Sequence, residues 1–247
     1  MSWQAGTLLT AASYNIHQCV GTDGRRDPER VATVIADIEA DVIGLQEVDF
    51  NPRGEKKSHQ LDFLAEATGM NAIAGRTIRR VDAEFGNALL TRWEIRRARF
   101  HDVSVPRRQP RGVIDADIIA HGRLVRVVVT HLGLAVNERR RQAEALLKIL
   151  SEAEESYDLT VLLGDINEWR PRGFATYSLD ATLGKMYSPR TFPSFFPVFS
   201  LDRIWVMPMG ALQEIKIPNN GLARIASDHL PLVATVNMTP APPAPVF

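Results

Sequence analysis

Short apolar runs alternate with amphipathic stretches along most of the chain, and this alternation is typical of an α/β fold. The apolar runs are rich in Val, Ile and Leu and are bounded by residues that favour turns, as strands are. They predict strands at residues 8–17, 41–48, 71–74, 86–91, 95–105, 112–120, 124–130, 159–167, 201–206, 211–217 and 232–236. The predicted fold is therefore centred on sheet.

Four further segments have helical character. They predict helices at residues 27–40, 59–68, 137–155 and 174–183. The first has a suitable N-cap in Asp27 and a proline, Pro28, in its first turn. The third repeats apolar residues at helical spacing, which predicts one buried face. These helices are expected to cover the sheets.

Polar side chains that can do chemistry recur where the predicted strands begin or end. They are Asn15, Glu47, Asn87, His131, Asp165, Asn167, Asp202, Asp228 and His229. Because side chains alternate along a strand, His17 is expected on the same face as Asn15. Each residue alone is also explained as a solvated group at a strand end or, for Asp228-His229, as a turn stiffened by Pro231. Nine together favour one shared site.

The residue types of this set indicate its chemistry. Carboxylates and amides without a cysteine cluster suit Mg²⁺, which prefers oxygen ligands and keeps several waters. A zinc cage would need more His or Cys at tighter spacing. The sequence has no phosphate-binding P-loop, no dinucleotide-binding glycine motif and no Gly-x-Ser-x-Gly nucleophile elbow. The candidate site is therefore a magnesium site, in which Mn²⁺ is expected to substitute.

Composition limits the class of protein to which this chain can belong. The 247 residues have a formal net charge of +0, which argues against a general polyanion binder, and Cys19 as single cysteine excludes an internal disulfide. No signal peptide or membrane-spanning run is recognisable. We expect a soluble, cytoplasmic monomer with one domain over residues 1–237. Residues 238–247 are predicted to form a mobile Pro/Ala-rich tail.

Two segments leave alternatives open. Residues 76–111 hold ten Arg, no Lys and four acids. Most of these arginines are expected on solvated strand faces and loops, while a subset could form a rim facing phosphate, since Arg binds phosphate bidentately. Residues 191–197 form an aromatic-proline loop that either packs into the core or forms a lip for the substrate.

Seven short motifs in order resemble the endonuclease/exonuclease/phosphatase superfamily, which includes DNase I, AP endonucleases, neutral sphingomyelinases and inositol polyphosphate 5-phosphatases. The motifs are Tyr14-Asn15-Ile16-His17, Leu45-Gln46-Glu47-Val48-Asp49, Gly86-Asn87-Ala88-Leu89-Leu90, Thr130-His131-Leu132, Gly164-Asp165-Ile166-Asn167, Leu201-Asp202-Arg203-Ile204 and Ser227-Asp228-His229-Leu230-Pro231. The sequence is most similar to compact bacterial members. The resemblance implies a four-layer α/β/β/α sandwich, in which two mixed β-sheets pack face to face with helices outside.

The resemblance also implies roles for individual residues. Glu47 corresponds to the main Mg²⁺ ligand, with Asn15 and Asp228 near the metal. Asp165 and Asn167 correspond to the pair that positions the attacking water and touches the phosphate, His229 to the catalytic histidine and Asp202 to its carboxylate partner. His131 corresponds to a histidine of the DNase I and sphingomyelinase-like branches, and Asn87, with His17, to the substrate pocket. Whether His229 or Asp165 is the general base stays open.

The implied activity is Mg²⁺-dependent hydrolysis of a phosphoester, as a phosphodiesterase or a phosphatase. The substrate is expected to be a small molecule, a lipid headgroup or nucleic acid. One alternative is a DNA endonuclease or exonuclease of the same family. Another, of a different class, is a catalytically silent phosphate-binding scaffold, although the presence of Glu47, Asp165 and His229 argues against it.

Overall fold

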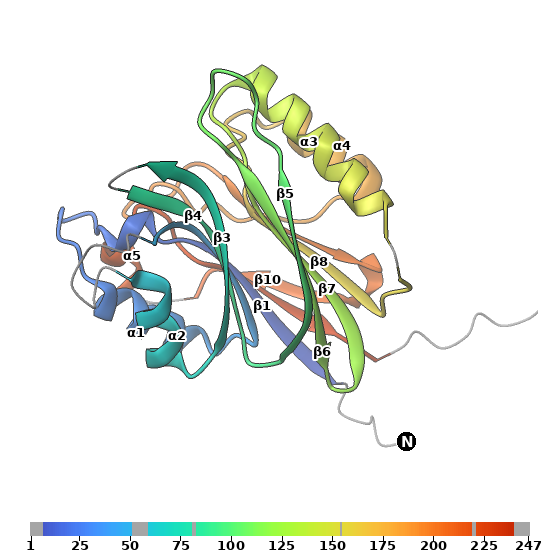
Figure 1. Ribbon diagram of the computed structural model, residues 1–247, viewed down its shortest axis with the longest axis horizontal. Helices are drawn as coiled ribbons and strands as arrows, with labels where there is room; N and C mark the ends of the chain where they lie inside the picture. The colour runs from blue at the N-terminus through green and yellow to red at the C-terminus, as the bar shows by residue number, and fades with distance from the viewer. Residues whose placement is uncertain (1–6, 51–58, 81–82, 154, 219–220, 240–247) are drawn as a thin grey trace, which may run out of the picture.

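The chain folds into two mixed β-sheets that pack face to face, with helices on both outer faces (Figure 1). The computed structural model describes residues 7–50, 59–80, 83–153, 155–218 and 221–239. This arrangement is the predicted four-layer α/β/β/α sandwich, so the expectation for the fold is confirmed. The predicted tail is described only at Met238 and Thr239, and the rest of it lies outside these ranges.

The first sheet has six strands and the second has five. The first has the order β10 (Leu212–Lys216), β11 (Leu232–Asn237), β1 (Leu8–Asn15), β2 (Val42–Asp49), β4 (Ala83–Thr91) and β3 (Asn71–Arg80). The second has the order β5 (Glu94–Asp102), β6 (Gly112–Ala120), β7 (Arg123–His131), β8 (Leu159–Asp165) and β9 (Asp202–Met207). Only the central pairs β1–β2 and β7–β8 are parallel among these neighbours.

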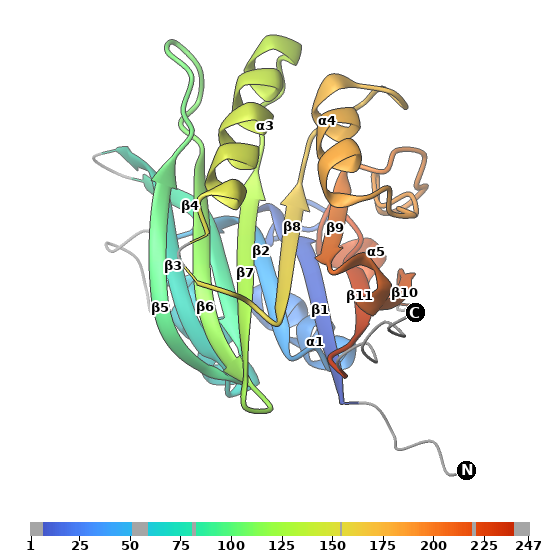
Figure 2. The same ribbon diagram turned by 90° about the vertical axis from the view of Figure 1, so that its right-hand side faces the viewer.

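Each parallel pair is joined by a crossover helix, and this is what places the helices outside. Helix α1 (Pro28–Ile38) links β1 to β2 and packs with α2 (Gln60–Thr68) and the short α5 (Ala223–Ala226) on the first sheet. Helix α3 (Val136–Ser151) links β7 to β8 and packs with α4 (Phe174–Leu183) on the second sheet. Figure 1 shows the two groups on opposite sides of the sheets, and in Figure 2 α3 and α4 lie in front of the second sheet. None of the helices in the described ranges is long and apolar enough to cross a membrane.

The core between the sheets depends on a close approach at Gly44 in β2. A Cβ atom at this position would lie 2.1 Å from Leu163 Cδ1 and 2.9 Å from Val129 Cγ1, both on the facing sheet. Such contacts are far below van der Waals distance, so only glycine lets the two sheets meet here. The approach brings β2 of one sheet against β7 and β8 of the other. The polar residues at the ends of these strands are thereby brought close together.

Most predicted elements are confirmed, and the differences lie at their ends. Strand β3 continues to Arg80 instead of ending at residue 74, because it pairs with β4 over its whole length. Helix α3 ends at Ser151 rather than at residue 155, and β5 ends at Asp102 rather than at 105. Three short elements of the described ranges were not predicted, namely α5 and the 3₁₀ turns η1 (His17–Cys19) and η3 (Met209–Ala211).

One of these differences concerns a candidate site residue. Strand β1 ends at Asn15, and His17 opens the turn η1 with φ +45°. The expectation that Asn15 and His17 leave one face of the same strand is therefore wrong. The strand period of two does not apply across the turn, because its three residues all have positive φ.

Candidate active site

The polar strand ends of both sheets surround one cavity of about 380 Å³. Of the nine residues singled out at strand ends, seven line it directly: Glu47, Asn87, His131, Asp165, Asn167, Asp228 and His229. Asn15 and Asp202 complete the group through hydrogen bonds to lining residues. His17 is not among the residues that line the cavity. The two central parallel strand pairs bring these residues together around the cavity.

Glu47 is aimed into the cavity by a bulge in β2. The pairing of β2 with β4 shifts register between Leu45 and Val48, and Glu47 has φ +56°. A bulge redirects one side chain of a strand, and a left-handed non-glycine residue costs about 1–3 kcal/mol. The fold therefore keeps Glu47 in an unfavourable conformation that places its carboxylate beside those of the second sheet.

Asn15 connects the two sheets at this point. Its Nδ2 donates to Glu47 Oε1 at 3.1 Å and to Asp165 Oδ2 at 3.2 Å. Its Oδ1 accepts the backbone N–H of His17 at 3.1 Å. In this arrangement Asn15 acts as a donor that holds two carboxylates together, while its oxygen is used by the turn η1.

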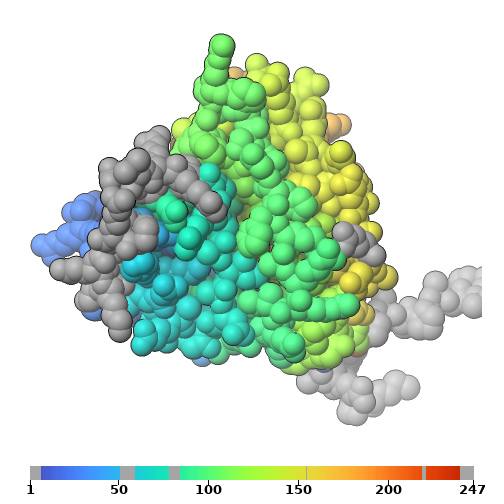
Figure 3. All heavy atoms as spheres, viewed as in Figure 1, coloured from blue at the N-terminus to red at the C-terminus, as the bar shows by residue number. Residues whose placement is uncertain are grey.

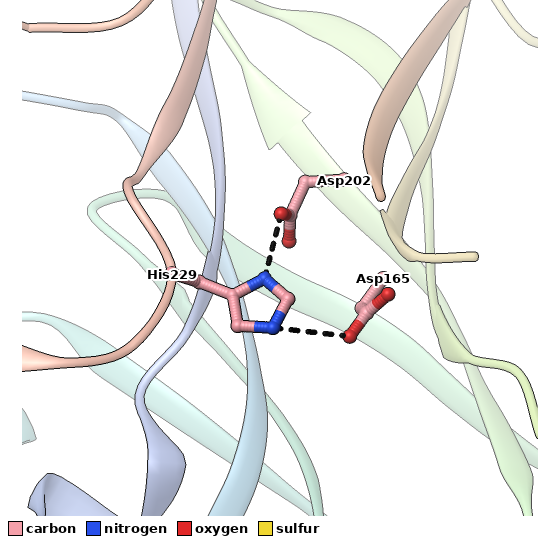
Figure 4. A group of neighbouring side chains, drawn as sticks. All are labelled: Asp165, Asp202 and His229. Atoms are coloured by element: carbon pink, nitrogen blue, oxygen red, sulfur yellow. Dashed lines mark hydrogen bonds and ion pairs between the residues drawn. The ribbon is translucent and has the colours of Figure 1, made fainter. Parts of the chain in front are cut away.

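His229 lies between two carboxylates, as Figure 4 shows. Its Nδ1 is 2.8 Å from Asp202 Oδ2, and its Nε2 is 3.7 Å from Asp165 Oδ2. Asp202 is fully buried, and its Oδ2 also accepts the hydroxyl of Thr191 at 2.5 Å. Asp202 therefore orients the ring, and Nε2 is the nitrogen that faces Asp165 and the cavity.

The two acids decide the protonation of this histidine. Burial disfavours the imidazolium, but the charges of Asp202 and Asp165 and the hydrogen bond to Asp202 outweigh it and raise the pKa of His229 to about 10. Burial raises the pKa of the Asp165 carboxyl above its ordinary value, although His229 counteracts this. At neutral pH the arrangement favours a protonated His229 that can donate from Nε2.

His131, on the other side of Asp165, is held in the neutral state. Burial, together with the positive charges of Arg111 and His229, lowers its pKa well below the ordinary value. Arg111 Nη1 lies 3.2 Å from His131 Nδ1, and because a guanidinium can only donate, Nδ1 is the acceptor. The ring proton is then on Nε2, which lies 3.5 Å from Asp165 Oδ2. Asn167 Nδ2, 3.0 Å from the same nitrogen, is also a donor, and it donates to Leu132 O at 3.0 Å instead.

The loop after β8 positions Asp165 and Asn167. Asp165 Oδ1 accepts the backbone N–H of Asn167 at 2.8 Å, and Asn167 has φ +53°. Gly164 allows β8 to run against β7, because a Cβ there would lie 1.9 Å from Thr130 O. The buried pair of Arg139 and Glu168, 3.1 Å apart, joins this loop to the first turn of α3.

The remaining candidates have local partners. Asn87 is buried, and its Nδ2 donates to Gly112 O at 2.9 Å. Asp228 is partly exposed, and its Oδ1 lies 3.8 Å from His17 Nδ1. His17 Nδ1 lies 3.0 Å from Val20 O, within its own turn. Asn87 and Asp228 line the cavity, whereas His17 contacts Asp228 without lining it.

Comparison with known proteins agrees with this geometry. The sequence model of the Endonuclease/Exonuclease/phosphatase family matches residues 12–229. The chain belongs to this family. It is 29% identical over 245 residues to the uncharacterized protein YbhP of Escherichia coli K12, and the alignment covers 91% of this chain and 94% of YbhP.

Solved structures of the family share the fold. The endonuclease/exonuclease/phosphatase from Beutenbergia cavernae matches with a TM-score of 0.76 at 21% identity, covering 96% of this chain and 73% of that chain. D. rerio TDP2 complexed with single strand DNA product matches with a TM-score of 0.68 at 18% identity, covering 94% and 99%. Members of this family are generally hydrolases that act on phosphoester bonds.

The site can accommodate a divalent metal of the kind this family uses. Ligand atoms of Asp165, Asp202 and His229 all lie within 4.8 Å of one another. The Asp202–His229 contact is a hydrogen bond, however, which leaves no room for an ion between those two atoms. Glu47 and Asp165, which share the amide of Asn15, and Asp228 face the same cavity. Three carboxylates around one space are the oxygen donors that a hard cation requires.

Sequence reasoning did not single out three residues that contact this set. Thr191 donates to Asp202, Phe192 lies with its ring centre 4.8 Å from that of His229, and Arg111 contacts His131. Arg111 is the arginine of the basic stretch 76–111 that lines the cavity. Other arginines of that stretch have acidic partners elsewhere, such as Arg99 with Asp115 and Asp117. No signal in the sequence distinguishes Arg111 from the other arginines of this stretch.

Proposed function

We propose that this protein is a Mg²⁺-dependent phosphoester hydrolase in which water attacks phosphorus. The observation that carries the proposal is the position of His229, oriented by Asp202, 3.7 Å from Asp165 in a cavity that also contains Glu47 and Asp228. Carboxylates, an acid-base pair and an arginine around one space form the set that phosphoryl hydrolysis uses.

Glu47 and Asp228 are proposed to hold the metal, with Asn15 supporting Glu47. When bound, Mg²⁺ would offset negative charge that develops on the phosphoryl oxygens. Asn15 keeps the Glu47 carboxylate in place through its 3.1 Å hydrogen bond. Two carboxylates at one cation leave the remaining coordination positions to waters and substrate, as is usual for Mg²⁺.

The proton is proposed to be handled by Asp165 and His229. The Nδ1–H of His229 is committed to Asp202, so only Nε2 is available to the cavity. A protonated Nε2 can donate to a phosphoryl oxygen, and the Asp165 carboxylate is the acceptor for the proton of the attacking water. Of the two candidates for the general base, we therefore propose Asp165.

The donors on the other side of Asp165 suit the substrate phosphate. Arg111 has no acidic partner among the ion pairs of the described residues, and it lines the cavity beside His131 and Asn167. A guanidinium binds phosphate oxygens bidentately. We therefore propose Arg111, Asn167 and His131 as phosphate-binding residues, with Asn87 at the edge of the pocket.

The test is a panel of phosphoesters with Mg²⁺ or Mn²⁺. It contains bis-p-nitrophenyl phosphate, p-nitrophenyl phosphate, plasmid DNA, single-stranded DNA, abasic DNA and phospholipids. Hydrolysis of one class, lost in EDTA and in His229→Ala, is expected. Cleavage of DNA alone would favour the nuclease alternative. No hydrolysis of any substrate by the metal-loaded protein would reject the proposal and favour a silent phosphate-binding scaffold.

A further inference from the structure

The mouth of the cavity is bordered by large apolar side chains that are exposed to solvent. Leu134 and Trp169 line the cavity and are 65% and 38% exposed. Phe199 lies with its ring centre 5.0 Å from that of Trp169, and the adjacent turn carries Phe195 and Phe196, which are 66% and 70% exposed. We call these five residues the mouth rim. Exposed apolar side chains gathered at one place mark a binding surface rather than ordinary surface composition.

The turn that carries Phe195 and Phe196 is firmly attached to the loop of His229. The backbone N–H of Ser194 donates to Asp228 O at 2.7 Å, and its hydroxyl donates to Ser227 O at 2.7 Å. Arg224 Nη1 donates to the carbonyls of Ser194 and Phe195. Because the backbone is held at so many points, the exposure of the two rings is a built feature of the fold.

The other residues of the loop 191–197 face the core. Thr191 and Ser194 are fully buried, and Phe192 packs against His229. Of the two alternatives for this loop, packing into the core therefore holds for these residues, and a role as a lip can involve only its outer side. Its inner side supports the catalytic histidine, and its outer side projects apolar rings next to the mouth.

The segments that carry the mouth rim, together with segment 104–111, are rich in basic residues. Segments 104–111, 132–137 and 169–200 each contribute residues that line the cavity. Together they contain one acidic residue, Asp180, which accepts the indole N–H of Trp205 at 2.9 Å. Their basic residues are Arg107, Arg108, Arg111, Arg170, Arg172, Lys185 and Arg190, and all except Arg111 are exposed. The exposed charge of these segments is thus complementary to an anionic surface, since the adjoining Glu138 and Glu168 are buried, although the whole chain has no net charge.

The arrangement of these segments fits a broad surface. The hairpin loop between β5 and β6, which carries Arg107 and Arg108, and the N-terminal end of α3 after Leu134 lie at the same end of the molecule (Figures 1 and 2). Figure 3 shows this hairpin, in green, projecting at that end. The catalytic cavity opens among these projections.

The kind of apolar residue separates two possible occupants. Single-stranded nucleic acid is bound by aromatic rings on which bases stack along a basic groove. The surface here also exposes the aliphatic side chains Leu134, Val136 and Val198, which offer no ring for stacking. Aromatic and aliphatic side chains together, with Lys and Arg beside them, are the composition of proteins that lie on a lipid interface.

We propose that the mouth rim seats the protein on an anionic phospholipid surface, so that the cavity receives a phosphoester in a lipid headgroup. The identification of the cleaved bond rests on the proposed function, whereas the seating on lipid does not. Phe195, Phe196 and Leu134 enter the interfacial layer, and the surrounding arginines contact lipid phosphates.

The test measures binding and hydrolysis separately. Binding is followed by co-sedimentation in EDTA with vesicles of phosphatidylcholine alone and vesicles that also contain phosphatidylglycerol. The wild-type protein is expected to bind the anionic vesicles more tightly. The double variant Phe195→Ser/Phe196→Ser, and independently Leu134→Ser on the other side of the mouth, should weaken this binding by at least about 10-fold. Phe100→Ser changes a ring that is 58% exposed on β5 and serves as the matched control, with unchanged binding.

Measurements of hydrolysis show whether binding to the vesicle is needed for cleavage of a lipid phosphoester. The double variant should cleave soluble bis-p-nitrophenyl phosphate like the wild type but lose activity on phospholipid in vesicles. Vesicle binding without hydrolysis of any phosphoester would refute the proposed function and leave the seating intact. The seating is overturned if the wild type binds neither vesicle, if all variants bind equally, or if Phe195 and Phe196 instead support binding of a single-stranded oligonucleotide or formation of a dimer.

Discussion

Asn15 Nδ2 lies 3.2 Å from Asp165 Oδ2, a contact between two side chains that are 150 positions apart in the sequence. The same nitrogen donates to Glu47, so one amide holds together an acid from each sheet. The backbone carbonyl of Asn15 accepts the hydroxyl of Ser227, next to Asp228 and His229. Asn15 is therefore the residue at which the two halves of the site are joined.

Replacing this amide by a carboxylate should separate the two acids. In Asn15→Asp both hydrogen bonds are lost and three like charges meet in a mostly buried space. We expect kcat on a phosphoester to fall by at least about 10-fold, since each hydrogen bond to a charged group contributes about 1.5–3 kcal/mol. Asn71→Asp is the matched control, because Asn71 bonds only Trp93 O at an exposed position. Equal kcat in both variants would contradict the joining role.

His229 and Asp202 should behave as one catalytic unit. His229→Ala is expected to lower kcat by roughly 10²–10⁴-fold, and Asp202→Asn should lower it too because the amide cannot stabilise the imidazolium. The double variant should be no worse than His229→Ala, since residues that act together are not additive. Steady-state kinetics at saturating Mg²⁺ measures all three, and multiplicative losses in the double variant would show independent roles.

Thr191 should act through Asp202. Its hydroxyl and His229 Nδ1 both donate to Asp202 Oδ2, so Thr191→Val leaves a fully buried carboxylate with one donor fewer at that oxygen. We expect kcat to fall by about 10-fold, corresponding to the 1.5–3 kcal/mol of a charged hydrogen bond, with KM nearly unchanged. Thr191→Ser keeps the hydroxyl and should restore most of the activity. A Ser variant as slow as the Val variant would assign the effect to packing instead.

Glu47 should determine the response to metal. EDTA is expected to abolish hydrolysis, and Mg²⁺ or Mn²⁺ should restore it. Glu47→Gln removes the charge while keeping the size, so the Mg²⁺ concentration for half-maximal activity should rise by at least about 10-fold. His229→Ala should not move that concentration, because the proposed carboxylate ligands remain. Full activity after exhaustive chelation would remove the metal role altogether.

A buried ion cluster away from the cavity should set the acid stability. Asp115 is 1% exposed and bonds Arg126 at 2.7 Å and Arg99 at 2.9 Å. Burial opposes ionisation, but hydrogen bonds from Arg126 and Arg99 outweigh it and lower the pKa of Asp115 to about 2. Because the folded-state pKa lies below the unfolded value of about 3.9, the stabilisation is present above about pH 4 and is lost as the pH falls through 2.

Urea unfolding from pH 6 to pH 2.5 tests this. Asp115→Asn should lower the free energy of unfolding by about 3–5 kcal/mol near neutrality, because it leaves the buried Arg126 without a carboxylate partner, while Arg99 keeps Asp117. The difference in free energy of unfolding between Asp115→Asn and the wild type should decrease by about 2 kcal/mol as the pH falls from 6 to 2.5. Asp158→Asn, at an exposed pair with Arg123, should change little. If this difference is constant with pH, Asp115 is not the residue that makes the free energy of unfolding depend on pH.

The sequence by itself determined the sheets, the main helices and the place of the site. Strand patterns depend on neighbouring residues, so the apolar runs before Asp165 and around Glu47 predicted strands without knowledge of their partners. A charged residue buried at the end of a strand is costly unless it is paired or binds a metal, and the repetition of such residues indicated one shared cavity. The family resemblance then proposed roles for them.

Tertiary structure alone decided the contacts that make these residues a site. The bulge that turns Glu47, the amide of Asn15 between two sheets and the hydroxyl of Thr191 on Asp202 all depend on pairing and packing between distant segments. Nothing local distinguished Arg111 from its paired neighbours, or placed His17 outside the strand. The local pattern specifies which face of an element is buried. Which residues pack against that face is decided only when the two sheets pack together.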